Sequence, residues 1–294
     1  MARPMDAQDG QAPVPASTRI GASRFANLGV RLASALAMAV VALGALFLGF
    51  PFWPMLVLII VMGTAWEWNR MLSRSGSVEA LALIAGLAVV TALAAFDLAA
   101  IAVIVSIVGF VVLVAVGKGR GRKTHAAGML YFGLPSVALI WLAADPRDGA
   151  LALLLVMVVV WVTDSAAFFT GRMVGGPKLW PSVSPNKTWA GSIGGLLGGL
   201  AAGVIWAAFV GATPLAGVAM LSCGLSLACQ AGDLLESGIK RRFDLKDTSG
   251  LIPGHGGLMD RLDGLIGAVL LAALVALAVS PGAPAEALLP GMPR

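Results

Sequence analysis

Long apolar stretches separated by short polar loops dominate the pattern of the chain. Nine of them can be delimited, at about residues 32–49, 54–66, 78–96, 98–117, 127–144, 150–170, 190–210, 214–232 and 264–279. Most approach the roughly 20 residues that an α-helix needs to cross a bilayer. None alternates apolar and polar residues as the strands of a membrane barrel do. The pattern therefore predicts an all-α, polytopic integral membrane protein with about nine transmembrane helices.

The distribution of Lys and Arg predicts how these helices are oriented. When the loops between nine spans are assigned to alternate sides, all 20 Lys and Arg residues except Arg147 and Arg294 fall on the side of the N-terminus. Short loops rich in Lys and Arg face the cytoplasm. We therefore expect a cytoplasmic N-terminus and a C-terminus on the opposite side of the membrane.

The ends of the chain differ from this pattern. Residues 1–30 are rich in Ala, Pro, Gln and Asp and carry basic residues, which predicts a disordered basic tail before a membrane domain at residues 31–280. Residues 281–294 are rich in Pro, Gly and Ala, which predicts a flexible C-terminal tail.

Composition supports a membrane protein and limits the possible partners. Hydrophobic residues make up 59% of the chain, well above the roughly 45–50% of soluble domains. The net charge of +5 does not indicate a nucleic-acid partner, because the basic residues lie in short loops between apolar stretches. Cys223 and Cys229 fall in one apolar stretch and imply no disulfide framework.

Residues 230–263 carry unusually many charges for so apolar a chain. Asp233, Asp260 and Asp263 offer the oxygen ligands that divalent cations prefer. The basic residues here suit phosphate groups, and they are Lys240, Arg241, Arg242, Lys246 and Arg261. Residues 253–257 read Pro-Gly-His-Gly-Gly, a backbone that can bend sharply and approach a ligand closely. Together they indicate metal-assisted phosphate chemistry.

The same segment carries a family resemblance. The pattern is Ser237-x-Ile239-Lys240-Arg241, then Lys246-Asp247-x-Ser249, then Ile252-Pro253-x-His255-Gly256-Gly257-Leu258-x-Asp260-Arg261-Leu262-Asp263. It resembles the signature of the phosphatidate cytidylyltransferases, the CDP-diacylglycerol synthases. The resemblance implies a transfer of CMP from CTP to phosphatidate, with Asp233 and Asp260 holding the catalytic cations. Magnesium is the expected cation, with a second cation possible beside it, because carboxylates and substrate phosphates commonly hold Mg²⁺ together.

A second element precedes the seventh apolar stretch. Ser184, Lys187 and Thr188 place two hydroxyls and a cation where a helix is expected to begin, which suits an anion. The Ser-Pro-x-Lys-Thr sequence resembles another motif of the same family, in which Glu usually follows two residues after the Thr. Here that position is Ala190, so the chain either dispenses with this carboxylate or supplies it from elsewhere.

The expected site can be stated residue by residue. We expect Asp233, Asp260, Lys240, Arg241, Lys187 and His255 to be catalytic, and Asp233, Asp260, Asp164 and Asp263 to serve the metal. The substrate-binding residues are expected to be Ser184, Lys187, Thr188, Ser237, Lys240, Lys246, Gly256, Gly257 and Arg261. His255 is expected to hydrogen-bond a phosphate or a carboxylate, since it lacks the partners of a zinc site.

Three residues have open or modest interpretations. Asp164 is either functional, as ionisable groups inside membrane helices usually are, or interfacial and in contact with water. Glu67 either lines the site or anchors the chain at the membrane interface. His125, in a basic loop, is expected to be solvated.

Other functions were weighed against this interpretation. A CDP-alcohol phosphotransferase would need further aspartates after Asp263-Gly264, and none follows. A transporter would place its polar residues near mid-membrane, whereas these gather at one predicted face, and a relative that only binds CDP-lipid stays open because of Ala190. The small residues at 191–199 favour close helix packing, either within the chain or in a homodimer. We expect the protein in the bacterial cytoplasmic (inner) membrane, with its site facing the cytoplasm.

Overall fold

The computed structural model describes residues 33–119, 121–252 and 256–292, so the predicted tail at residues 1–30 lies outside the described residues. A first helix spans Ala33–Leu48. The remaining elements are α2 (Phe52–Met71), α3 (Val78–Ala95), α4 (Ala99–Val116), α5 (Arg122–Ala143), α6 (Gly149–Val174), β1 (Lys178–Trp180), β2 (Ser184–Thr188), α7 (Trp189–Phe209), α8 (Leu215–Arg242), the 3₁₀ turn η1 (Met259–Arg261), α9 (Asp263–Val279) and α10 (Pro284–Leu288).

The architecture is a helical bundle, as the apolar pattern predicted. Within the described residues, six helices are long and apolar enough to cross a membrane, namely α3 to α8. The helix Ala33–Leu48 and α9 are apolar but shorter, and α2 carries Glu67 and Arg70. An all-α membrane protein is therefore confirmed, while the count of nine spans and the sides of the two termini stay predictions.

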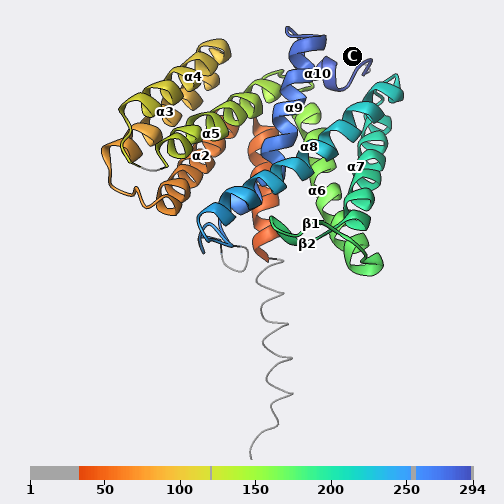
Figure 1. Ribbon diagram of the computed structural model, residues 1–294. Helices are drawn as coiled ribbons and strands as arrows, with labels where there is room; N and C mark the ends of the chain where they lie inside the picture. The colour runs from red at the N-terminus through yellow and green to blue at the C-terminus, as the bar shows by residue number, and fades with distance from the viewer. Residues whose placement is uncertain (1–32, 120, 253–255, 293–294) are drawn as a thin grey trace, which may run out of the picture.

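The helices form two groups that meet along α5 and α9. Figure 1 shows α2, α3, α4 and α5 on one side and α6, α7 and α8 on the other, with α8 crossing the bundle obliquely. Helix α9 packs against α8, α5 and α6 and so joins the groups. The interior contains large apolar side chains such as Leu83, Leu153 and Leu225, none of which is exposed.

Helix α7 packs against α6 and α8 through its glycines. A Cβ atom at Gly199 would lie 2.3 Å from the Thr163 hydroxyl on α6, and one at Gly203 would lie 1.9 Å from the Ser222 hydroxyl on α8. A larger residue at either position would clash with these side chains unless they or their helices shift. This contact supports the interpretation that the small residues serve packing within the chain.

Two helices extend beyond their apolar stretches into charged sequence. Helix α8 continues to Arg242 and α5 begins at Arg122, although their apolar stretches end near 232 and begin near 127. Hydropathy marks the part of a helix that can enter lipid, whereas the hydrogen-bonded helix continues wherever its polar face finds partners. The charged residues at the end of α8 therefore continue the same helix as far as Arg242.

A short antiparallel hairpin interrupts the helices between α6 and α7. Lys178 lies opposite Thr188, and Trp180 lies opposite Ser184. Thr188 then caps α7, because its hydroxyl accepts a hydrogen bond of 3.1 Å from the Gly191 N–H. The prolines and glycines of this region exclude a long helix, but the hairpin itself was not predicted.

The described part of the C-terminal segment differs from the predicted flexible tail. Residues 284–288 form α10, which contacts α9, α6 and α5. Leu288 and Leu289 are buried, and the Thr213 N–H donates a hydrogen bond of 2.7 Å to the Pro290 carbonyl. The segment therefore packs on the bundle beside the loop between α7 and α8.

Candidate active site

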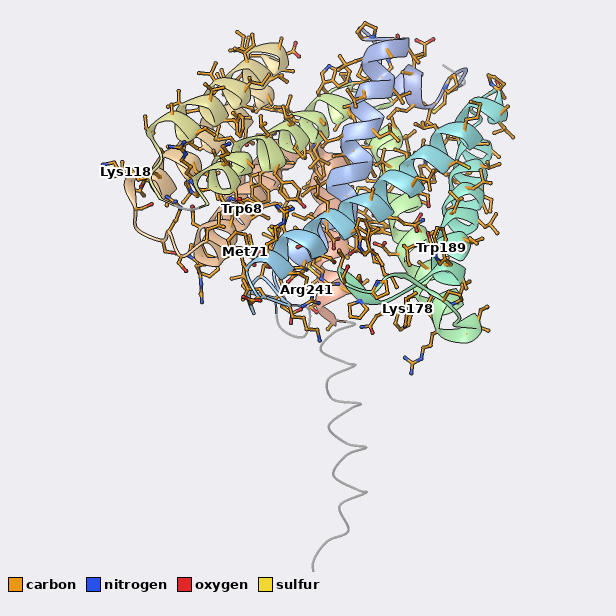
Figure 2. All side chains as sticks on the ribbon, in the orientation of Figure 1. Trp68, Met71, Lys118, Lys178, Trp189 and Arg241 are labelled. Carbon is orange, nitrogen blue, oxygen red and sulfur yellow. The ribbon has the colours of Figure 1, made fainter. Side chains whose placement is uncertain are left out.

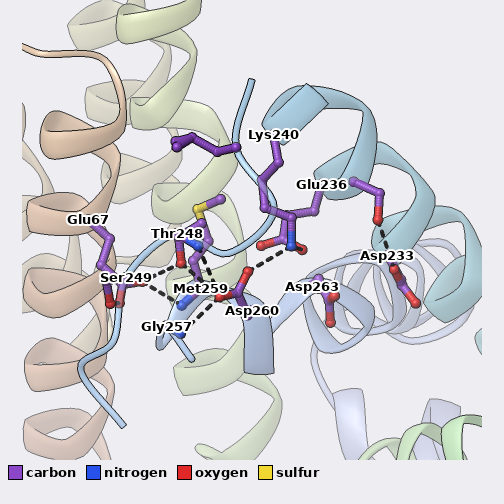
Figure 3. A network of polar contacts seen from close by, with 12 residues as sticks. Glu67, Asp233, Glu236, Lys240, Thr248, Ser249, Gly257, Met259, Asp260 and Asp263 are labelled. Atoms are coloured by element: carbon purple, nitrogen blue, oxygen red, sulfur yellow. Dashed lines mark hydrogen bonds and ion pairs between the residues drawn. The ribbon is translucent and has the colours of Figure 1, made fainter. Parts of the chain in front are cut away.

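The predicted site residues gather at one end of the bundle, where α8 ends and the hairpin folds back. Lys178 on the hairpin and Arg241 near the end of α8 both lie there (Figure 2). Between α8 and η1 the described residues 243–252 and 256–258 form a loop, which carries much of the family signature. The loop and η1 are bound to α2 and α8 by polar contacts (Figure 3).

Glu67 on α2 anchors this loop. Its side chain is completely buried and accepts hydrogen bonds from the backbone N–H groups of Leu258, at 2.8 Å, and Met259, at 2.7 Å. The hydroxyls of Thr248 and Ser249 donate to the same carboxylate. A buried charge is tolerated only when it is paired or well hydrogen-bonded, and here four donors satisfy it. Of the two interpretations left open by the sequence, the structure places Glu67 inside the network rather than at the membrane interface.

Asp260 is the second anchor of the loop. One carboxylate oxygen accepts from Lys240 Nζ at 2.7 Å. The other accepts from the Gly257 N–H at 2.8 Å and from both the N–H and the hydroxyl of Thr248 at 3.1 Å. Burial raises the pKa of Asp260, but the hydrogen bonds from Lys240, Gly257 and Thr248 outweigh it and hold the pKa below its ordinary value. Asp260 is therefore an ionised carboxylate at neutral pH.

Lys240 lies between two carboxylates. Its ammonium group is 2.9 Å from Glu236 Oε2, one turn earlier on α8, and 2.7 Å from Asp260 Oδ1. Glu236 is fully buried, and within the described residues neither of its oxygens accepts a hydrogen bond of regular geometry. One lysine thus contacts two buried carboxyl groups.

Asp233 faces the hairpin instead. It forms an ion pair with Lys187 on β2, and Ser237 Oγ donates to it at 3.3 Å. The side chains of Lys187 and Asp233 are 26% and 29% exposed, in contrast to the buried partners of Lys240. This ion pair therefore connects the hairpin to α8.

Asp164 and Asp263 complete the acidic cluster. Asp164 on α6 accepts a long contact of 3.6 Å from the Cys229 thiol, and Asp263 lies in the first turn of α9, beside Glu236. Asp164, Asp233 and Asp263 are close enough for their negative charges to repel one another. Asp164, Asp233 and Asp263 therefore lie near one another, as expected from the sequence, although they come from three helices.

The remaining predicted residues lie around this cluster with different contacts. Arg241 donates to the carbonyls of Val183, at 3.4 Å, and Leu245, at 3.2 Å, and so ties the hairpin to the end of α8. The Thr188 hydroxyl is engaged in the α7 cap. Ser184 begins β2, Gly256 has a φ of +84° and pairs with Ile252, Gly257 is buried, and Lys246 and Arg261 are exposed. His255 lies outside the described residues.

The donor chemistry of the cluster fits a divalent cation, but its present arrangement does not form a finished metal site. Among the described residues, no three His, Cys, Asp or Glu side chains converge on one point as metal ligands. Asp233, Glu236 and Asp260 nevertheless pair with two ammonium groups, Asp164 and Asp263 lie close by, and within the described part of the chain the buried oxygens of Glu236 lack regular hydrogen bonds. Hard oxygen donors in excess are what Mg²⁺ prefers. The assignment of a metal to Asp233, Asp260, Asp164 and Asp263 stays a prediction.

Sequence reasoning missed or misjudged a few polar residues. His125 is not solvated as expected, because it is buried and its Nε2 contacts Asn69 Oδ1 at 2.8 Å between α5 and α2. Thr248 was not singled out, although it contacts both Glu67 and Asp260. Glu67 could have been recognised earlier, since a carboxylate inside an apolar helix needs buried partners.

Comparisons with known proteins agree with this geometry. The profile of the Cytidylyltransferase family matches residues 29–279. The chain is 37% identical over 249 residues to a protein of Brucella suis biovar 1 named phosphatidate cytidylyltransferase, covering 84% of this chain and 92% of that protein. A protein of the same name from Haemophilus influenzae is 45% identical over 130 residues, covering 42% of this chain and 45% of that protein.

Proposed function

The chain belongs to the CTP-dependent phosphatidate cytidylyltransferase family, and from this premise we propose that it transfers CMP from CTP to phosphatidate, forming CDP-diacylglycerol and pyrophosphate. The observation that carries the proposal is the convergence of two lysine and carboxylate groups at one end of the bundle. Lys240 with Asp260 comes from the family signature, and Lys187 with Asp233 joins the second motif to α8.

The reaction places modest demands on acid and base chemistry. The nucleophile is a phosphate oxygen of phosphatidate, which is already ionised at neutral pH, so no strong general base is required. The barrier comes from bringing two polyanions together and from the charge that accumulates on the leaving pyrophosphate. Groups that hold phosphates in line and neutralise their charge therefore supply the catalysis.

The residues of this site suit those tasks. We assign phosphate contacts to Lys187, Arg241 and Lys246, with Lys240 adding its positive charge from its place between Glu236 and Asp260. Asp233 and Asp260 would hold Mg²⁺, with Asp164 and Asp263 as supporting carboxylates. Such a cation would supply positive charge that lowers the repulsion between the phosphate groups.

The membrane setting also belongs to the proposal. Phosphatidate would enter sideways from the bilayer, and CTP would arrive from the cytoplasm of a bacterial cell. The support is the Lys and Arg distribution, which puts all the proposed phosphate contacts on the cytoplasmic side.

The experiment that tests the function measures labelled CTP incorporated into chloroform-soluble lipid by the purified protein in detergent. We expect label only when phosphatidate and Mg²⁺ are both present. Asp233→Asn should lower turnover by at least about 100-fold, since lost electrostatic stabilisation of phosphoryl transfer is of that order. Asp244→Asn is the matched control, because Asp244 is exposed and Asn tolerates its φ of +55°.

Two results would contradict the proposal. A folded preparation that incorporates no label would exclude the reaction, and full Mg²⁺-dependent activity in Asp233→Asn would exclude the metal role of Asp233. Circular dichroism and gel filtration of each variant separate these results from misfolding.

A further inference from the structure

The two lysines of the site form ion pairs that differ in their exposure to water. Lys240 has an 11% exposed side chain, and its partners Glu236 and Asp260 are 0% and 6% exposed. Lys187 and Asp233 are each exposed to about a quarter, at 26% and 29%. Opening the Lys240 pairs would leave buried charges without partners, which is strongly unfavourable. Opening the Lys187 pair exposes both groups to water, so this contact is weakly held.

The backbone around Lys187 is fixed even if its ion pair opens. Thr188, the next residue, caps α7 and pairs with Lys178 across the hairpin. The Arg241 contact with the Val183 carbonyl holds the other end of β2. The flexible side chain of Lys187 can therefore turn away from Asp233 without any change in the fold.

Asp233 keeps a second partner when Lys187 leaves. The Ser237 hydroxyl, one turn later on α8, donates to its Oδ1. The Lys187 ammonium contacts the other oxygen, Oδ2. Loss of the lysine thus frees one oxygen of a carboxylate that stays oriented by α8.

We propose that Lys187 and the divalent cation compete for Asp233, and that the displaced ammonium group then binds a phosphate of the nucleotide. This inference rests on the proposed function, because it takes Asp233 as a cation ligand. Lys187 neutralises Asp233 before substrates arrive, and the nucleotide gives the lysine a new anionic partner once the cation has taken its place. Cation and nucleotide consequently strengthen each other's binding, by the same factor in both directions.

The test measures Mn²⁺ binding by electron paramagnetic resonance on the full-length protein in detergent, without nucleotide or lipid. Lys187→Met should tighten Mn²⁺ binding by about fivefold, because it removes the ammonium group that competes with Mn²⁺ for the partly exposed Asp233. Lys178→Met removes an exposed lysine from the same hairpin and should leave the affinity unchanged. The same Lys187→Met protein should bind CTP more weakly than the wild type in the presence of Mg²⁺.

A double variant separates competition for Asp233 from a general effect of charge. In the Asp233→Asn background, Lys187→Met should no longer tighten Mn²⁺ binding, since the contested carboxylate is absent. Unchanged or weaker Mn²⁺ binding by Lys187→Met alone would overturn the inference. So would an equal gain in affinity with and without Asp233.

The measurement is independent of the test of turnover. If no labelled lipid forms but Lys187→Met tightens Mn²⁺ binding through Asp233, the proposed reaction fails and the competition stands. If labelled lipid forms and the Mn²⁺ affinity of Lys187→Met equals that of the wild type, the reaction stands and the competition fails.

Discussion

The segment between α8 and α9 and the β1–β2 hairpin border the same site, yet buried carboxylates hold the first and partly exposed contacts hold the second. Four donors contact each of Glu67 and Asp260, and they come from the loop, from Met259 or from Lys240, with the single Thr248 hydroxyl proton shared between the two carboxylates. The hairpin contacts α8 through the Lys187 ion pair and one long Arg241 hydrogen bond. The difference indicates that the signature loop is preorganised and that the hairpin side chains can exchange partners.

The largest effect is expected from Glu67→Ala, which removes the anchor of the loop. The Ser249 hydroxyl and the backbone N–H groups of Leu258 and Met259 would lose their acceptor, while the Thr248 hydroxyl would keep Asp260. We expect a loss of about 3 kcal/mol in the free energy of unfolding, together with loss of turnover. Thermal unfolding in detergent measures the first and CTP incorporation the second.

The control for this change is Glu79→Gln, at the start of α3, outside the network. It should leave the midpoint of thermal unfolding close to that of the wild type, because a solvent-screened charge at a helix N-terminus contributes little to stability. If Glu67→Ala unfolds at the same temperature as the control, Glu67 does not anchor the loop.

A smaller effect on stability is expected when the pH is lowered and Asp260 becomes protonated. Its pKa lies below the ordinary value, so the ionised form stabilises the fold. This contribution is complete above the ordinary Asp pKa and is lost as the pH falls through the lower pKa of the folded state. Hydrogen exchange of the loop amides between pH 6 and pH 3 measures it, and Asp260→Asn should make the exchange of those amides less dependent on this acid titration.

A pH profile of the wild type that matches the profile of Asp260→Asn, after correction for intrinsic exchange rates, would show that Asp260 contributes nothing to this stability. Lys240 should keep its contact with Glu236 in the variant, since both belong to α8.

The smallest effect on stability is expected from Lys187→Met in the hairpin. A partly exposed ion pair contributes at most about 1 kcal/mol, so the midpoint of thermal unfolding should stay close to that of the wild type. Turnover should nevertheless fall. A large loss of stability would mean that the hairpin is held as firmly as the signature loop, and the contrast between the two segments would disappear.

The sequence predicted the helical class because apolar stretches of membrane length leave few alternatives. It did not predict where helices end, since α8 runs ten residues past the stretch that ended near 232, on the strength of contacts such as Glu236 with Lys240. The sequence also did not predict the hairpin, because its two strands are too short to show an alternation of apolar and polar residues. The sequence could not show that the polar residue His125 is buried, because its partner Asn69 lies 56 positions away.

The sequence identified most acidic and basic residues of the site, because their types and spacing match the motifs. Their pairing could not be predicted, because spacing along α8 places Asp233, Glu236 and Lys240 on one face without saying what lies opposite. The structure adds that Lys240 faces Asp260 and that Asp233 faces Lys187. It also places Glu67 in the site and shows that Thr248, an unspecified position of the signature, contacts both Glu67 and Asp260.

The packed C-terminal segment decides how the sidedness of the protein can be measured. A reporter protein fused directly after α9 would remove α10, the buried Leu288 and Leu289, and the bond between Thr213 and Pro290. Such a fusion could report the location of a damaged bundle. A reporter placed after Arg294 keeps these contacts, and its fluorescence or enzymatic activity then reports on which side of the membrane Arg294 lies.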